Sequence, residues 1–405
     1  MQPLPFERIR VLDFGWVWAG AVLGHVLADM GAEVIKVESR RRLDPARQGR
    51  PIIGDTPDPE QNPLYHNVNR GKMCVTVDIS HAEGRRVVEQ LASISDIVVE
   101  NMSPHALAAA GLDYQNLRRV NPQVIMVSCP LAGQYGPRNE LRGYGNAAGA
   151  LVGLDSIGAD PDGDEFCGFN HVQGDPSSSQ YGVIAALAAF HHRLRTGEGQ
   201  YIDLSMWEAV GTMMGVATMD YVMNGRIAAP QGNRHAFMAP HGIYPCQGDD
   251  MWVSIAVSTQ EEWEAFRSAL DSPSWAWEER FSDGYQRALH RRELDHHVAQ
   301  WTSGMDAYEV METLQRAGVA AMPCLNQEGR YFNPHLQARA AYVDVEHPVL
   351  GTEPLYGIPY KLSGTPGRIR RHAPIMGEHN DYVFGELLGL SAEDSRYLTE
   401  QKVLY

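Results

Sequence analysis

An aspartate in the segment GDPSSS is the residue of this 405-residue chain that is best suited to covalent chemistry. Asp175 lies at or just before the predicted start of a long helix. A helix N-terminus stabilises negative charge, and an ionised carboxylate that is held in place can act as a nucleophile. An aspartate that only caps the helix is the more frequent arrangement. From these residues alone, both interpretations stay open.

Three groups of basic residues have no acidic partner nearby in the sequence. Arg70 and Lys72 precede a predicted strand, Arg142 precedes Tyr144, and a run of arginines spans residues 40–42. Charged side chains of this kind are usually solvated. Because α/β sheets bind ligands at the carboxyl ends of their strands, a convergence of these groups there would suit an anion bearing adenosine phosphates.

The first strand, turn and helix, followed by a strand that ends at Glu38, resemble a dinucleotide-binding unit. The turn reads GWVWAG, however, and lacks the pattern G-x-G-x-x-G. Trp16 and Trp18 stand where the backbone should approach a pyrophosphate closely. The turn therefore disfavours a nicotinamide dehydrogenase, and the two tryptophans either line a pocket or pack beneath one.

Strands alternate with helices over the first 130 residues, and these elements must position the side chains above. Strands are expected at residues 8–14, 33–38, 73–78, 96–100, 124–128 and 201–204. Helices are expected at residues 18–30, 81–92, 105–110, 114–120 and 144–154, from 175 to 194, and from 205. This alternation predicts an α/β fold with a doubly wound, mostly parallel sheet.

The pattern changes near Gly225, which suggests a second domain. Helices are expected there at residues 263–270, 287–302 and 307–317. A last helix is expected from residue 379, in the tail that follows this domain. A length of 405 residues also exceeds what one hydrophobic core usually spans. We therefore expect a smaller domain at residues 225–333.

Composition excludes several classes of protein. The chain carries 34 Lys+Arg and 50 Asp+Glu, a net charge of −16, which argues against a nucleic-acid partner. A hydrophobic content of 44% argues against disorder. No apolar run approaches the ~20 residues of a membrane helix, so no membrane association is expected. Five widely spaced cysteines indicate reduced thiols in the cytoplasm and no metal site.

Five segments in order resemble the family III CoA-transferases, the group of formyl-CoA and carnitine-CoA transferases. They are VLDFGWVWAG with LADMGAEVIKVES, DIVVEN, GDPSSS, RTGEGQ with a following SM, and APIMGEH. The resemblance implies a Rossmann-like large domain built from both chain ends, residues 1–224 and 334–405, with the small α+β domain inserted between them. It also implies two subunits that interlock as linked rings.

The resemblance implies that Asp175 is the nucleophile. Its carboxylate would attack a donor acyl-CoA to give an aspartyl-acyl anhydride, and the CoA thiolate would convert this into an aspartyl-CoA thioester. An acceptor carboxylate would then take over the CoA. Coenzyme A and acyl-CoA are substrates in this scheme, which needs no permanently bound cofactor.

The resemblance also implies contacts with CoA. Trp16, Val17, Trp18 and Ala19 match the loop beside the CoA thiol, and Lys72, Asn101, Met102, Arg142 and Tyr144 match further contact positions. Two family arginines of the adenosine end align with Ser39, next to Arg40, and with Ala109. The glycine-rich lid of formyl-CoA transferase is replaced by GNRH at residues 232–235.

Two alternatives share this fold. Racemases carry a histidine as a second acid/base group, where this chain has Tyr144, so a transferase is preferred. A non-catalytic subunit of a heteromer is disfavoured by the presence of Asp175. With His25, the tryptophans of the WVWAG loop suggest a pocket for a bulky or aromatic acid.

The whole pattern, including the WVWAG loop, most resembles the benzylsuccinate CoA-transferases of anaerobic toluene degradation. That branch implies succinyl-CoA as the donor and (R)-2-benzylsuccinate as the acceptor. It also implies either a homodimer or a heteromer with a related subunit.

Overall fold

The computed structural model describes residues 3–161 and 173–405, which form two compact units. The larger unit contains residues 3–154, 173–227 and 340–405. The smaller unit contains residues 155–161 and 228–339. Cys167 lies outside the described residues, and the other four cysteines are free thiols.

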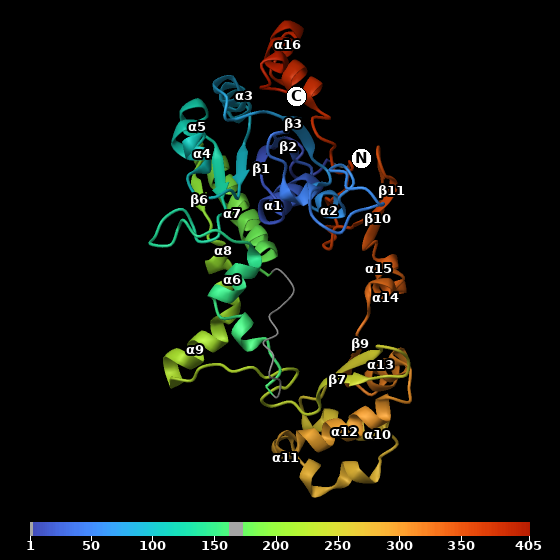
Figure 1. Ribbon diagram of the computed structural model, residues 1–405. Coiled ribbons are helices and arrows are strands. Elements are labelled where there is room, and N and C mark those ends of the chain that lie inside the picture. The colour runs from blue at the N-terminus through green and yellow to red at the C-terminus, as the bar shows by residue number, and fades with distance from the viewer. Residues whose placement is uncertain (1–2, 162–172) are drawn as a thin grey trace. The chain divides into compact units, whose positions relative to one another are not determined.

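A six-stranded parallel sheet forms the centre of the larger unit, with the strand order β3-β2-β1-β4-β5-β6 (Figure 1). The strands are β1 (Arg10–Phe14), β2 (Glu33–Glu38), β3 (Met73–Thr76), β4 (Ile97–Glu100), β5 (Ile125–Ser128) and β6 (Tyr201–Asp203). The first five consist mainly of buried apolar residues, as in sheets that are covered on both faces. The predicted doubly wound, mostly parallel sheet is confirmed.

Helices cover both faces of this sheet. They are α1 (Ala19–Asp29), α2 (Pro63–Asn69), α3 (Ala82–Ser93), α4 (Ala106–Ala109), α5 (Tyr114–Val120), α6 (Gly145–Leu151), α7 (Gly174–Thr196), α8 (Met206–Gly211) and α9 (Gly215–Asn224). Leu12 of β1 packs in one core with α3 and α5, whereas its neighbour Val11 packs in another with α1 and α7. Successive strand residues thus point to opposite cores.

The strand order reverses at β1, which has β2 on one side and β4 on the other. The loops that follow β1 and β4 therefore leave the sheet at a topological switch point. Open α/β sheets bind their ligands in the crevice at this position. Residues 15–18 and 101–105 form these two loops.

The last segment of the chain belongs to the larger unit. It contains the antiparallel hairpin β10 (Tyr342–His347) and β11 (Gly351–Tyr356), a π-helical turn η6 (Asp381–Leu387), and helix α16 (Ala392–Glu400). The single helix predicted from residue 379 is wrong. The chain breaks at Gly389, where φ is +69°, and restarts at a capping box between Ser391 and Asp394.

The smaller unit is built around a three-stranded antiparallel sheet. Its elements are β7 (His241–Pro245), β8 (Trp252–Ala256), β9 (Ala320–Pro323), α10 (Gln260–Ala269), α11 (Gly284–Leu289), α12 (Arg291–Thr302), α13 (Ala307–Arg316), α14 (Gln327–Tyr331) and α15 (Pro334–Ala338). Trp263 and Phe266 stack in its core. The helix predicted over residues 287–302 divides at His290. In the described part of the chain, no helix is both long and apolar enough to cross a bilayer.

Candidate active site

Two backbone N–H groups from other helices hold the carboxylate of Asp175. The Ala19 N–H donates to Oδ1 at 3.3 Å, and the Gly145 N–H donates to Oδ2 at 2.9 Å. Ala19 and Gly145 are the first residues of α1 and α6, and Asp175 itself lies in the first turn of α7. Three helix N-termini therefore meet at one carboxylate, where they favour negative charge.

Asp175 does not cap its own helix. The N-cap position of α7 belongs to Gln173, which makes no capping bond through its side chain. The carboxylate of Asp175 instead accepts from the N–H groups of the other two helices, so the simpler explanation of this aspartate as the N-cap of α7 is wrong.

Burial raises the pKa of Asp175, while the N–H groups of Gly145 and Ala19 lower it and offset part of that shift. The residue is only 4% exposed. A carboxylate that is poorly solvated and held by fixed donors is more basic than one in water, yet remains oriented. These are the properties that a carboxylate nucleophile needs.

A cavity of about 560 Å³ opens beside this carboxylate, within the larger unit. We call it the Asp175 cavity. Its lining includes Trp16, Val17, Arg42, Asn101, Met102, His105, Cys129, Leu131, Arg142, Tyr144, Asp175 and Met206. Seven residues singled out from the sequence thus lie around one space, at the switch point of the sheet. Their contacts with CoA stay predictions.

Lys72 lies inside the fold rather than in the Asp175 cavity. Its Nζ donates to Asp13 Oδ2 at 2.6 Å, to Asn69 Oδ1 and to the Ala21 carbonyl oxygen. Burial lowers the pKa of Lys72 to about 8, although Asp13 opposes the shift. Arg70 is paired as well, with Asp29 at 2.8 Å, so both basic residues have acidic partners that are distant in the sequence and neither lines the cavity.

The arginine run at residues 40–42 contributes a different member than expected. Arg40 is exposed and is not part of the cavity lining, whereas Arg42 lines the cavity. The guanidinium of Arg42 lies 4.9 Å from the ring centroid of Trp16, a cation–π arrangement. The run itself signalled a basic site, but the turn after β2 decides which arginine reaches it.

The loop after β1 is fixed by contacts to its backbone. The Asn101 side chain accepts from the Trp16 N–H at 2.8 Å and donates to the Trp16 carbonyl at 3.0 Å. Gly15 has no room for a side chain, because a Cβ there would lie 2.4 Å from the Gly20 carbonyl carbon. Asn101 thus fixes the backbone of the loop at Trp16 and also forms part of the cavity wall.

The remaining predicted residues divide between backbone and packing roles. Trp18 is half-buried at the N-cap position of α1, and Ala19 contributes its N–H to Asp175. Tyr144 precedes α6 and is 61% exposed. His25 is buried within α1, with its Nδ1 3.2 Å from the Val68 carbonyl oxygen, and so does not shape the cavity.

Comparisons with known proteins agree with this arrangement. The family described as CoA-transferase family III matches residues 6–380. The chain is 31% identical over 402 residues to the succinyl-CoA–D-citramalate CoA-transferase of Chloroflexus aurantiacus, covering 99% of this chain and 98% of that protein. It is also 31% identical over 406 residues to the succinyl-CoA–L-malate CoA-transferase beta subunit of that organism, covering 99% and 98%.

A solved structure shares the fold as well. A CAIB/BAIF family protein from Brucella suis superposes with a TM-score of 0.86 at 28% identity, covering 95% of this chain and 100% of that one. The family match spans nearly the whole chain and includes every element around Asp175. The chain therefore belongs to CoA-transferase family III and is a CoA-transferase.

Proposed function

We propose that this enzyme moves CoA from succinyl-CoA to a dicarboxylic acid with an aromatic substituent, such as (R)-2-benzylsuccinate, through covalent intermediates on Asp175. One observation carries the proposal: the Asp175 carboxylate is buried, held by the N–H groups of Ala19 and Gly145, and faces the Asp175 cavity.

In the first half-reaction, an Asp175 oxygen attacks the thioester carbonyl of succinyl-CoA. The C–S bond breaks, CoA leaves as a thiolate, and an aspartyl-succinyl anhydride remains. The thiolate then attacks the aspartyl carbonyl carbon, which releases succinate and leaves an aspartyl-CoA thioester. The N–H groups of Ala19 and Gly145 are placed to stabilise the negative charge that develops on the aspartyl oxygen.

In the second half-reaction, a carboxylate of the acceptor attacks the aspartyl thioester and expels the thiolate again. The new anhydride joins Asp175 to the acceptor. Attack of the thiolate on the acceptor's acyl carbon forms the product thioester and frees the Asp175 carboxylate. Each step exchanges one acyl bond for another, so atoms and charges balance without a further reactant.

The choice of substrates rests on the relatives and on the cavity. Both named relatives use succinyl-CoA with a dicarboxylic acid. Arg42 and Arg142 give the cavity two cationic side chains for anionic substrates. Trp16 and Tyr144 give it two aromatic side chains, which suit a phenyl substituent. The sequence of the loop around Trp16 also resembles the benzylsuccinate branch.

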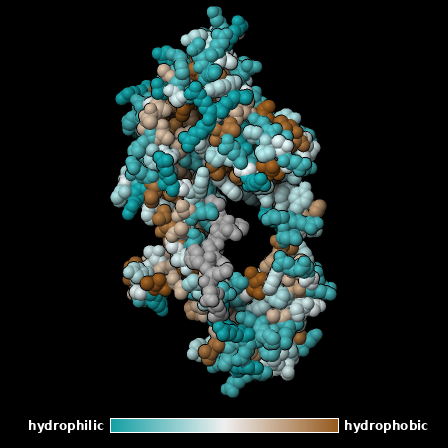
Figure 2. All heavy atoms as spheres, viewed as in Figure 1, coloured by the Kyte–Doolittle hydropathy of each residue, from teal (hydrophilic) through white to brown (hydrophobic). Residues whose placement is uncertain are grey.

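We also propose that the enzyme works in the cytoplasm as an interlocked dimer, with a second copy or a related subunit. Helix α9 has no buried residue, and Val216, Val222 and Met223 are 87%, 70% and 73% exposed. Brown atoms gather in Figure 2 where α9 lies in Figure 1. An apolar helix of this kind usually marks an interface. Light scattering of the purified chain should give twice the monomer mass, or do so after a paralogue is added.

A trapping experiment tests the nucleophile. Wild-type enzyme incubated with succinyl-CoA and hydroxylamine should carry a hydroxamate on Asp175, detected by peptide mass spectrometry. Asp175→Ala should lose transfer and labelling while it still binds acyl-CoA. Asp306→Ala is the matched control, because it removes a helix-capping aspartate from α13 without touching the cavity. Full turnover by the Asp175→Ala variant contradicts the proposal.

A substrate screen tests the acceptor. The proposal expects mass spectrometry to find benzylsuccinyl-CoA formed faster than malyl-CoA when both acids compete for succinyl-CoA. A preference for malate would instead assign the acceptor to dicarboxylic acids without an aromatic substituent. Solvent deuterium at the α-carbon of an acyl-CoA, without transfer, would instead identify a racemase.

A further inference from the structure

We infer that Asp44 is a positioning residue of the transfer reaction: with Lys36 it holds Val17 in a left-handed conformation and so keeps the N–H of Ala19 on Asp175. The inference rests on the proposed role of Asp175 and adds residues that do not themselves touch the Asp175 cavity.

The backbone of Val17 is strained. Its φ angle is +58°, in the left-handed region. Valine is β-branched, and such residues occur there only as outliers because Cβ approaches the following carbonyl oxygen. A conformation of this kind persists only where surrounding contacts impose it. Val17 lies two residues before Ala19, so its conformation sets the direction in which the chain enters α1.

Two buried side chains hold the backbone that leads into the strained residue. Asp44 Oδ1 accepts from the Val17 N–H at 3.0 Å, and Asp44 Oδ2 accepts from Lys36 Nζ at 3.0 Å. Lys36 Nζ also donates to the carbonyl oxygen of Gly15, two residues before Val17. Both side chains are 0% exposed. The pair therefore holds the loop at two points, the Gly15 carbonyl oxygen and the Val17 N–H, which both precede the Cα of the left-handed residue.

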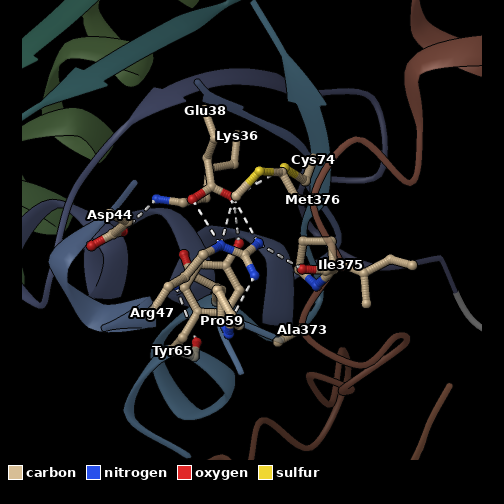
Figure 3. A network of polar contacts seen from close by, with 12 residues as sticks. Lys36, Glu38, Asp44, Arg47, Pro59, Tyr65, Cys74, Ala373, Ile375 and Met376 are labelled. Atoms are coloured by element: carbon tan, nitrogen blue, oxygen red, sulfur yellow. Dashed lines mark hydrogen bonds and ion pairs between the residues drawn. The ribbon is translucent and has the colours of Figure 1, made fainter. Parts of the chain in front are cut away.

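The pair is itself anchored in the sheet (Figure 3). Lys36 and Glu38 both lie on β2, and Asp44 caps the short turn η1 (Pro45–Arg47). Arg47, at the end of that turn, donates to Glu38 at 2.7 Å and to the Pro374 carbonyl oxygen at 3.1 Å. Asp44 is thus fixed both by Lys36 of β2 and by its position as the cap of η1, and it can in turn restrain the loop after β1.

A buried ion pair of this kind is weak support for stability, because desolvation offsets most of the attraction. The position of the Lys36–Asp44 pair is better explained by the loop after β1 that it orients. Asp44 is only 1% exposed and does not line the cavity, so its replacement removes no direct contact with acyl-CoA. The chemical step should suffer, since small misplacements of catalytic groups slow reactions strongly.

Asp44→Asn is the first test, because it keeps the shape of the side chain and removes its charge. In single turnovers with succinyl-CoA, the covalent adduct on Asp175 should form about tenfold more slowly. The KM for succinyl-CoA should stay within about twofold of the wild-type value. Asp29→Asn is the matched control, because it breaks another buried pair, with Arg70, near the opposite end of α1. This control should lower Tm and leave the rate of adduct formation unchanged.

A double-mutant cycle with Val17→Gly separates positioning from simple stabilisation. Glycine adopts positive φ without strain, so the loop then needs less support from Asp44. Asp44→Asn should therefore slow adduct formation much less in the Val17→Gly background than in the wild type. A merely structural role for Asp44 would give the same slowing in both backgrounds and would overturn the inference.

The remaining outcomes are also decisive. Adduct formation at the wild-type rate in Asp44→Asn overturns the inference while leaving the role of Asp175 intact. Absence of any adduct in the wild type overturns the proposed function itself. If Asp44→Asn does not fold, Lys36→Met removes the same pair from its other member and keeps an apolar stem. The same cycle with Val17→Gly then applies to that variant.

Discussion

Gly174→Ala tests the geometry of the nucleophile without touching its carboxylate. Gly174 is the first residue of α7 and packs against the first residue of α6. A Cβ at this position would lie 2.6 Å from the Cα of Gly145 and 2.9 Å from its carbonyl oxygen. Carbon atoms in contact are normally about 3.5–4.0 Å apart, so the two helix ends must separate by roughly 1 Å.

That displacement is enough to break the hydrogen bond from the Gly145 N–H to Asp175, which is 2.9 Å long. Loss of one preorganised backbone donor typically lowers kcat by roughly 10²–10³-fold, or about 3–4 kcal/mol. Overpacking of the helix contact should cost about 1–3 kcal/mol in the free energy of unfolding. We therefore expect a folded protein with a lower Tm and a kcat that is reduced far more than its KM changes.

The assay is steady-state transfer from succinyl-CoA, together with thermal unfolding. Gly284→Ala is the matched control, because Gly284 is the first residue of α11 and its added Cβ would meet only the Arg287 side chain, at 3.7 Å. It should retain wild-type kcat. If Gly174→Ala keeps wild-type kcat, or if Gly284→Ala loses as much activity, the assignment of Gly145 as a donor to the reacting carboxylate is refuted.

Three further predictions concern charge. The pKa of Asp175 is higher in the folded state than in the unfolded state, so ionisation of this carboxyl destabilises the fold as pH rises. Asp175→Asn should therefore raise Tm at neutral pH. It should leave Tm unchanged in acid, where the wild-type carboxyl is also neutral. The pKa of Glu38 is lowered to about 2: burial opposes this shift, but Arg47 and Lys36 outweigh it. The ionised Glu38 carboxylate therefore stabilises the fold at pH values above its unfolded-state pKa of ~4.3, and this stabilisation is lost as pH falls toward 2. Glu38→Gln should lower the free energy of unfolding by about 3–5 kcal/mol at neutral pH, and Tm should then fall less steeply in acid than it does for the wild type. Arg42→Ala should raise the KM for succinyl-CoA about three- to fivefold and leave kcat unchanged, because the cavity loses one cationic side chain and its cation–π contact with Trp16. Steady-state kinetics at low salt would measure this change in KM.

The sheet could be predicted from the sequence because its signals are local. Each of the first five strands contains a short stretch of buried apolar residues, and helical patterns separate most of them, so the order of elements along the chain already implied a doubly wound fold. The broken C-terminal helix was missed because its apolar residues continue across Gly389, and only the capping box at Ser391 marks the new start.

The sequence could predict which residues belong to the site but not the contacts that they make. Asp175 was found through its neighbours in sequence, yet its two N–H donors lie 156 and 30 residues away. Lys72 pairs with Asp13, which is 59 residues away in the sequence, so no local pattern could show that its charge is already paired. The choice of Arg42 over Arg40 depends on the turn after β2, in which the Arg42 N–H donates to the Ser39 carbonyl oxygen at 3.2 Å; a run of three arginines does not show which one reaches the cavity.

The order of synthesis places a constraint on how this fold forms in the cell. The core beside α3 includes Val383, Phe384, Leu398 and Val403, and the end of β3 pairs with Leu404. All of these residues emerge from the ribosome after the smaller unit, whose last residues are near 339. Part of one sheet face of the nascent larger unit therefore stays uncovered while the entire second unit is made. During this period chaperones can bind the exposed apolar surface, and aggregation competes with folding.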